Sequence, residues 1–417
     1  MPIQLLPLVI PLGQPARLTV QHLTPGSRYA IQVRSRRQVT PDLECELSAD
    51  DAGCLRIEGT YALAGEYTVD IAAPSSGARL ARLGFFVASP DLFARRPLRA
   101  DFHIHTHYSD GRNSPAEMVI RGRELGLDVL AITDHNNYTG ATEAVAERAR
   151  LGLNLVDMPG EEVTSPTWHI VAVNADTGIY DRMLEAFGLV GADKPTVDAR
   201  LSDYDALCWA IRATQAHGGR AYLAHPYWAI DRGFNMPTAL YDRILEEGIL
   251  DGLELIGEVK YEDNVRSLAR YLDLRAAGRT LPIVGNSDTH GAQHTYGLYW
   301  TLVFATEPSP AGVLQAIAEG WSVACTTVTP TAPANTSLTG RAASMQAWGS
   351  FELVDYAYFL EEHFYPMHDA LCVEEAALAY RAWRGDHLPA GAMAACHADM
   401  AALVARCWGG SSTQGQP

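Results

Sequence analysis

The chain has 417 residues, of which 47% are hydrophobic, so it is long enough to bury the cores of two or three domains. Its formal net charge is −17 and its only lysines are Lys194 and Lys260, which argues against a nucleic-acid partner because affinity for a phosphate backbone depends mainly on cationic side chains. No apolar run reaches the roughly 18–20 residues of a membrane span, and the first residues lack the basic stretch of a signal peptide. We therefore expect a cytoplasmic protein that binds a small-molecule substrate and neither membrane nor nucleic acid.

Residues 1–95 contain short runs of alternating apolar and polar residues, separated by the turn sequences TPGS, DDAG and PSSG. The expected strands read ARLTVQHL, RYAIQVRSR, CLRIEGTYAL, GEYTVDIAA and ARLGFFVAS. Several short strands at this spacing predict a small β-sandwich module, followed by a linker.

Residues 99–325 show a different rhythm, in which apolar strands alternate with amphipathic helices. The expected strands read ADFHIHT, DVLAITDH, NLVDMPGEEVT, HIVAVN, RAYLAHP, GLELIG, PIVGNSD and YWTLVFA. Expected helices begin at Ser114-Pro115, where Glu117 completes a capping box, and cover 203–217, 238–247, 263–277 and 310–319. Repeated βα units predict a parallel sheet or barrel, with its active-site face at the carboxyl ends of the strands.

Residues 326–417 are expected to form a loop and helical extension. The segment 326–345 reads as a loop, 347–385 and 390–408 read as helices, and the tail reads as disordered. Whether these helices pack on the barrel or on a second subunit stays open, so a homo-oligomer is one of the alternatives.

The seven cysteines are scattered along the chain, odd in number, and include no CxxC pair. This argues against a disulfide framework and against a thiolate zinc site.

Histidines and carboxylates gather at the ends of the expected strands. In chain order they are His103, His105, Asp110, Asp134, His135, Glu161, Glu162, His169, His225, Asp288 and His290. Residues i and i+2 of a strand face the same side, so His103 projects with His105, and Asp288 with His290. Imidazole and carboxylate without thiolate form a ligand set for Zn, Mn or Fe. The candidates exceed the roughly four to six ligands of one ion, so we expect two or three divalent metal ions that share a bridging carboxylate.

Each motif alone has a plainer explanation. An HxH on a strand is usually incidental, and His225 before Pro226 could be a core or turn histidine. Their joint placement favours metals, because burying so many ionisable groups without partners would cost several kcal/mol.

The same motifs resemble a known family. HIHTHYSDG, ITDHN, PGEEVTS, AHP and GNSDTHG, in this order over about residues 100–295, resemble the PHP (polymerase and histidinol phosphatase) superfamily, and the β-module ahead of them resembles its CehA/McbA branch of metallohydrolases. The resemblance implies an α/β fold built on a distorted (βα)7 barrel with a trinuclear metal centre. Carried over by position, it implies a first metal held by His103, His105, Glu162 and Asp288, a second held by Glu162, His169 and His225, and a third held by Asp110, His135 and His290.

Two positions depart from the family pattern. Both Glu161 and Glu162 are present where the family usually has one glutamate, and the spacing favours Glu162. Trp168 stands where a glycine often precedes the histidine aligned with His169, so Trp168 could shape the pocket.

These features predict a metal-dependent hydrolase. Clustered metals lower the pKa of a bridging water from about 15.7 toward neutrality and neutralise charge in the transition state, with Asp288 placed to orient the hydroxide. The leaving group could be protonated by His290, His107 or His294. The remaining candidates for substrate contact are the aromatic residues Trp168, Tyr227, Trp228 and Tyr296 and the cations Lys260 and Arg232, although both cations also read as surface residues.

The sequence leaves three functions open. The family resemblance favours hydrolysis of a small phosphomonoester or phosphodiester. The CehA/McbA branch and the aromatic residues favour a carboxylic or carbamate ester. The third alternative is a non-catalytic scaffold that keeps its metals for stability.

Overall fold

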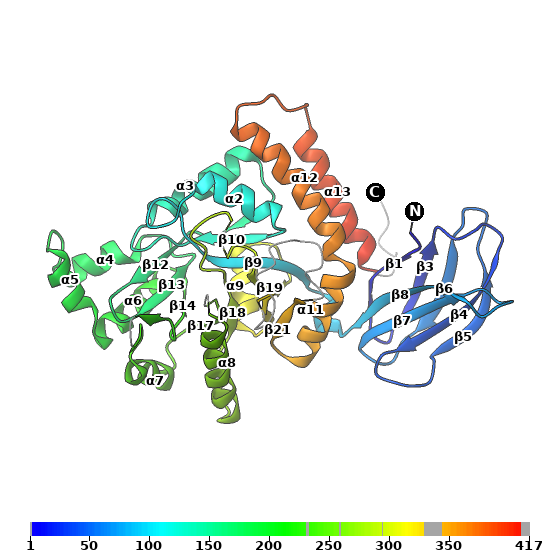
Figure 1. Cartoon of the computed structure of the whole chain (residues 1–417), viewed down its shortest axis with the longest axis horizontal. Coiled ribbons are helices and arrows are strands. Elements are labelled where there is room, and N and C mark those ends of the chain that lie inside the picture. Colours follow the sequence, from blue (N-terminus) through cyan, green and yellow to red (C-terminus); the bar gives the residue numbers. More distant parts are fainter. Residues whose placement is uncertain (1, 231–232, 258–259, 294, 329–343, 410–417) are drawn as a thin grey trace. The chain divides into compact units, whose positions relative to one another are not determined.

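The computed structural model describes residues 2–230, 233–257, 260–293, 295–328 and 344–409. The chain divides into two compact units (Figure 1). The first comprises Met1–Arg96, Phe351–Leu371 and Ala394–Pro417, and the second comprises Pro97–Ser350 and Cys372–Met393. The C-terminal segments are thus divided between the units, while the domain boundaries read from the sequence stay a prediction.

The first unit is built mainly of strands. They are β1 (Gln4–Leu6), β2 (Val9–Pro11), β3 (Pro15–Gln21), β4 (Arg28–Ser35), β5 (Leu43–Ser48), β6 (Leu55–Thr60), β7 (Gly65–Ala72) and β8 (Arg79–Ala88), followed by the short helix α1 (Pro90–Phe93). They form a three-stranded sheet in the order β1-β3-β6 and a five-stranded sheet in the order β2-β8-β7-β4-β5. Alternate residues of both sheets, such as Val20, Ile57, Val33 and Val69, share one apolar core. The predicted β-rich module is therefore confirmed.

Strand β5 was not expected from the sequence. It lies at the edge of its sheet, and its residues LECELS alternate between half-buried and exposed. A strand with no fully buried position has only a weak apolar signal.

The strands of the second unit are divided between two larger sheets. The first has the order β11-β10-β9-β19-β20-β21, and the second has the order β12-β13-β14-β17-β18. Their bounds are β9 (Arg96–Ile104), β10 (Val129–Ile132), β11 (Val156–Asp157), β12 (Gly160–Thr164), β13 (His169–Val173), β14 (Arg220–Leu223), β17 (Gly252–Ile256), β18 (Ile283–Gly285), β19 (Tyr299–Ala305), β20 (Ser322–Thr326) and β21 (Gln346–Trp348). A small hairpin joins β15 (Ala229–Ile230) to β16 (Gly233–Phe234).

The two sheets mix parallel and antiparallel strands, where the repeated βα units predicted a parallel sheet or barrel. Strands β12, β13 and β14 pair antiparallel, as do β19, β20 and β21. The segment NLVDMPGEEVT is also not one strand, because its two halves, β11 and β12, belong to different sheets. Isolated backbone bridges join Ile104 to Thr289 and His135 to Glu162 across the sheets. The closed (βα)7 barrel is not seen as one hydrogen-bonded sheet in the described residues and stays a prediction.

Helices connect these strands: α2 (Pro115–Glu124), α3 (Thr139–Leu151), α4 (Ile179–Ala186), α5 (Lys194–Leu201), α6 (Tyr204–Ala216), α7 (Thr238–Glu247), α8 (Tyr261–Ala276) and α9 (Pro310–Ala318). The predicted capping box at the start of α2 is present, with Ser114 and Glu117 each bonded to the other's backbone nitrogen. Helices α2 and α3 pack on each other and against β10 (Figure 1). Helices α3, α4 and α5 were not expected from the sequence.

The expected C-terminal helices are α11 (Phe351–His363), α12 (Tyr365–Trp383) and α13 (Ala392–Cys407). Most of the expected loop at 326–345 lies outside the described residues. Among the helices that are described, none combines the length and the apolar character needed to cross a membrane.

Candidate metal centre

The nine residues predicted as metal ligands all lie in the second unit, at or near strand ends. His103 and His105 lie at the end of β9, His135 follows β10, Glu162 is in β12, His169 begins β13, His225 follows β14, Asp288 and His290 follow β18, and Asp110 is in the loop after β9. Backbone hydrogen bonds fix these ends against one another. His105 N donates to Thr289 O at 2.9 Å, and Asn136 N donates to Glu162 O at 3.0 Å.

Glu162 is the centre of the arrangement. Its carboxylate is fully buried and lies within ion-pair distance of imidazole nitrogens from five histidines. Oε1 lies 2.8 Å from His169 Nδ1 and 3.0 Å from His225 Nε2. Oε2 lies 2.7 Å from His135 Nδ1 and 3.2 Å from His103 Nε2. A carboxylate in this position can bridge two cations.

Two further carboxylates complete the cluster. Asp288 Oδ1 lies 3.0 Å from His105 Nε2 and 3.3 Å from His103 Nε2. Asp110 is on the solvent side, with 58% of its side chain exposed, and its Oδ1 lies 3.2 Å from His290 Nε2. The site thus runs from a buried end at Glu162 to an open end at Asp110.

Three groups of these residues have ligand atoms within 4.8 Å of one another. They are His105 with Asp110, His135 and His290; His103 with Glu162, His225 and Asp288; and His135 with Glu162 and His169. The grouping differs from the one that the family resemblance implies, because His105 joins the open end and His225 joins His103. Which residues share an ion stays a prediction.

Backbone strain is concentrated at this site. His225, Asp288 and Asn136 have φ of 24°, 46° and 50°, in a region that residues other than glycine seldom occupy. Each such residue costs about 1–3 kcal/mol, and strain of this kind clusters at functional sites. The tertiary structure therefore holds these side chains in place against a local cost.

The electrostatics suit cation binding. Burial alone would raise the pKa of Glu162, but the charges of His135 and His103 hold it well below its usual range. A hydrogen bond from His290 lowers the pKa of Asp110 to about 2. Burial lowers the pKa of His169, which favours the neutral imidazole that a metal requires.

Glu254 is a supporting residue that the sequence reasoning missed. Its Oε2 lies 2.9 Å from His103 Nδ1 and accepts a hydrogen bond from Asn286 Nδ2 at 2.8 Å. This contact leaves His103 Nε2 facing Glu162, as expected of a carboxylate that orients a ligand histidine. The available signal was a charged residue in the otherwise apolar strand GLELIG.

Two carboxylates beside the candidate ligands have other roles. Asp134 accepts hydrogen bonds from Thr106 N at 2.7 Å and Ser109 Oγ at 2.6 Å, so it shapes the loop that carries Asp110. Glu161 accepts from the backbone nitrogens of Ile179 and Tyr180 at the start of α4. Glu162, and not Glu161, thus lies among the imidazoles.

The residues predicted to contact substrate lie in different surroundings. His107 is exposed and stacks on Tyr108, and Trp168 is fully buried in the core. Tyr227 packs against Phe234 and Tyr241. Lys260 is exposed at the start of α8, and His294 lies outside the described residues.

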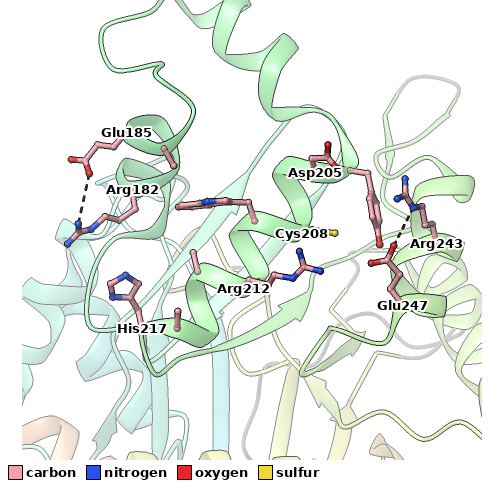
Figure 2. A pocket seen from close by; sticks show the side chains of 13 residues that line it. Arg182, Glu185, Asp205, Cys208, Arg212, His217, Arg243 and Glu247 are labelled. Carbon is pink, nitrogen blue, oxygen red and sulfur yellow. Dashed lines mark ion pairs between the residues drawn. The ribbon is translucent and has the colours of Figure 1, made fainter.

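A cavity of about 940 Å³ lies apart from this cluster, among α4, α6 and α7 (Figure 2). It is lined by three arginines and three acidic residues, and within it Arg182 pairs with Glu185 and Arg243 with Glu247. It includes none of the nine predicted ligands. Because its charges balance, the lining indicates no particular ligand.

One segment of the chain matches a known family model. Residues 101–181 match the family model described as the PHP domain. The match includes His103, His105, Asp110, His135, Glu162 and His169. The CehA/McbA branch stays a prediction.

Individual relatives are similar over short stretches. The "5'-3' exoribonuclease Rnm" of Escherichia coli (strain K12) is 41% identical over 81 residues, which are 18% of this chain and 27% of that protein. The "3',5'-nucleoside bisphosphate phosphatase" of Chromobacterium violaceum is 37% identical over 81 residues, again 18% of this chain and 27% of that protein. The chain thus spans about a quarter of the length of these curated relatives.

Among solved structures, a two-domain protein from Bacteroides vulgatus that contains a predicted PHP-like metal-dependent phosphoesterase is 22% identical. The similarity covers 55% of this chain and 65% of that chain, with a TM-score of 0.42.

Proposed function

We propose that this protein is a metal-dependent phosphoesterase that hydrolyses a small phosphomonoester or phosphodiester at a centre of two or three divalent ions. The observation that carries the proposal is the buried carboxylate of Glu162 in contact with five histidines. Such a cluster of ionisable groups in the protein interior needs cations as partners. The PHP match and the names of the relatives support phosphate chemistry.

The residues present fit divalent metals. His103 Nε2 and Glu162 Oε2 are buried, and within the described part of the chain their close contacts to other cluster atoms lack hydrogen-bond geometry. The donor set is imidazole and carboxylate, which suits Zn, Mn or Fe. His103, His105, Asp110, His135, Glu162, His169, His225, Asp288 and His290 would hold the ions. When bound, such ions supply a water of lowered pKa and polarise a phosphoryl oxygen.

The chain's own groups have distinct proposed roles. Asp288 lies between the buried and open ends, where its carboxylate can orient the attacking water. His290 is about one-third exposed and its Nε2 lies 3.2 Å from Asp110. In a two-ion centre that leaves His290 unligated, it can donate a proton to the leaving oxygen on the solvent side. Glu254 holds His103 in the ring orientation that ligation needs.

The substrate is proposed to be small. The matched exoribonucleases act on RNA by their names, but a net charge of −17 opposes the approach of a long polyanion. We therefore expect no nucleic-acid partner, and we expect the metals to meet the charge of a single phosphate.

The first experiment is elemental analysis of protein purified without chelator, followed by assays on three substrates. These are p-nitrophenyl phosphate, bis-p-nitrophenyl phosphate and 1-naphthyl acetate, each before and after chelation. Two to three metals per chain and chelator-sensitive release of nitrophenol support the proposal. Turnover of the naphthyl ester alone would indicate a carboxylic ester hydrolase, and turnover of no substrate by the metal-loaded protein would favour a scaffold.

A matched pair of variants tests the site. Glu162→Gln removes the central charge and should lower the metal content. It should also lower kcat by at least about 100-fold. His217→Ala removes a partly exposed histidine that pairs with Asp176 at 2.7 Å, outside the cluster, and should leave both unchanged. Equal behaviour of the two variants would contradict the assignment.

A further inference from the structure

Trp228 lies directly beside the candidate metal centre. Its ring centroid is 5.7 Å from that of His225 and 6.0 Å from that of His169, and it meets both imidazoles edge to face. Yet 43% of its surface is exposed. An indole surface is therefore open to solvent next to two predicted metal ligands.

The backbone that carries this side chain is held on both sides. Trp228 N donates to His225 O at 3.0 Å, which closes a turn with Pro226 as its second residue. On its other side, Asn235 N donates to Trp228 O at 2.6 Å, at the base of the β15–β16 hairpin. A backbone fixed before binding loses little entropy when a ligand arrives.

The exposure of Trp228 is not explained by a role in shielding the metals from water. Trp168, next to His169, is fully buried and already packs in the core. Tyr296, another aromatic residue of the motif region, is also buried and donates to Met118 O. Of the aromatic residues proposed from the sequence to contact substrate, Trp228 alone offers an exposed ring against the candidate ligands.

We infer that Trp228 forms a subsite that stacks a planar ring attached to the scissile phosphate, so that the natural substrate is an aromatic or heteroaromatic phosphate ester. The inference rests on the proposed function. A tryptophan face stacks on any planar ring, because aromatic stacking depends on the π-surface and on excluded apolar area. The subsite therefore selects the chemical class of the ester group and leaves the phosphate to the metals.

The test measures binding by calorimetry, in the manganese-loaded protein, of two non-hydrolysable anions. Phenylphosphonate and methylphosphonate share the phosphonate group and differ in the ring. Wild type should bind phenylphosphonate about tenfold more tightly, Trp228→Ala should lose most of this preference, and Trp228→Phe should keep most of it. Affinity for methylphosphonate should change less than about twofold in both variants.

Phe234→Ala is the matched control, because Phe234 is an exposed aromatic residue on the same hairpin. Its ring centroid lies 5.2 Å from that of Tyr227. This variant should keep the preference for the phenyl compound. No preference in wild type, or an equal loss for both anions in Trp228→Ala, would overturn the inference. The measurement follows binding and not turnover. Absence of phosphate-ester hydrolysis would therefore contradict the proposed function without deciding this inference.

Discussion

Replacing Glu254 by alanine should weaken metal binding although Glu254 is not a predicted ligand. The side chains of Glu254 and His103 are both fully buried, and the carboxylate accepts at 2.9 Å from His103 Nδ1. Without it, the ring loses the partner that fixes its tautomer and its orientation toward Glu162 and Asp288.

The expected size follows from this one contact. A hydrogen bond to a charged group contributes about 1.5–3 kcal/mol, which corresponds to roughly 10- to 150-fold in an equilibrium constant. Loss of an outer partner of a metal-ligating histidine typically costs about 10–100-fold in affinity. We therefore expect Glu254→Ala to bind zinc about 10–100-fold more weakly at its tightest site. Glu254→Gln keeps an acceptor for the Nδ1 proton and should lose less.

The assay is competition for zinc between metal-free protein and a chromophoric chelator, with thermal unfolding of the metal-free protein as the check on folding. Glu124→Ala is the matched control, since Glu124 is a half-exposed surface residue paired with Arg121. If Glu254→Ala is folded and binds zinc within a factor of two of wild type, then Glu254 does not position His103.

Three further predictions concern stability. Glu375→Ala leaves the buried guanidinium of Arg123 without one of its two carboxylate partners. It should lower the free energy of unfolding in urea by about 3–5 kcal/mol, and a loss below about 1 kcal/mol would contradict a buried network. Burial raises the pKa of Glu66 from 4.5 to about 7, so the folded state favours its protonated form. As the pH rises from about 4.5 to 7, wild type should therefore lose up to about 3 kcal/mol of stability relative to Glu66→Gln. Denaturant unfolding at pH 5 and pH 8 checks this, and a difference independent of pH would refute it. Removing metals by chelation should lower the unfolding temperature, since a ligand present at about 1,000 times its Kd stabilises the fold by roughly 4 kcal/mol. An unfolding temperature unchanged by chelation would argue against a bound metal cluster.

The sequence was most informative where chemistry is carried by short local patterns. His103 and His105 project together because alternate residues of a strand share a face, and this needs no tertiary information. The choice of Glu162 over Glu161 came from its spacing within the family motif. In the structure the Glu161 carboxylate instead accepts hydrogen bonds from the backbone at the start of α4.

Sequence patterns failed where pairing partners are distant in the chain. The direction of β13 could not be read from its five buried residues, because a fully buried strand has the same apolar run in parallel and antiparallel sheets. The separation of β11 from β12 depends on which strands accept their hydrogen bonds, and these lie far along the chain.

The sequence by itself determined the kinds of side chain at the site, their order and their placement at strand ends, because residue type and strand periodicity are local properties. Only the tertiary structure decided which ligands lie together, that Glu254 supports His103, and that Trp228 stays exposed beside His225 and His169. Most of these are distances between residues separated by tens to more than a hundred positions, and they are set by how two sheets meet.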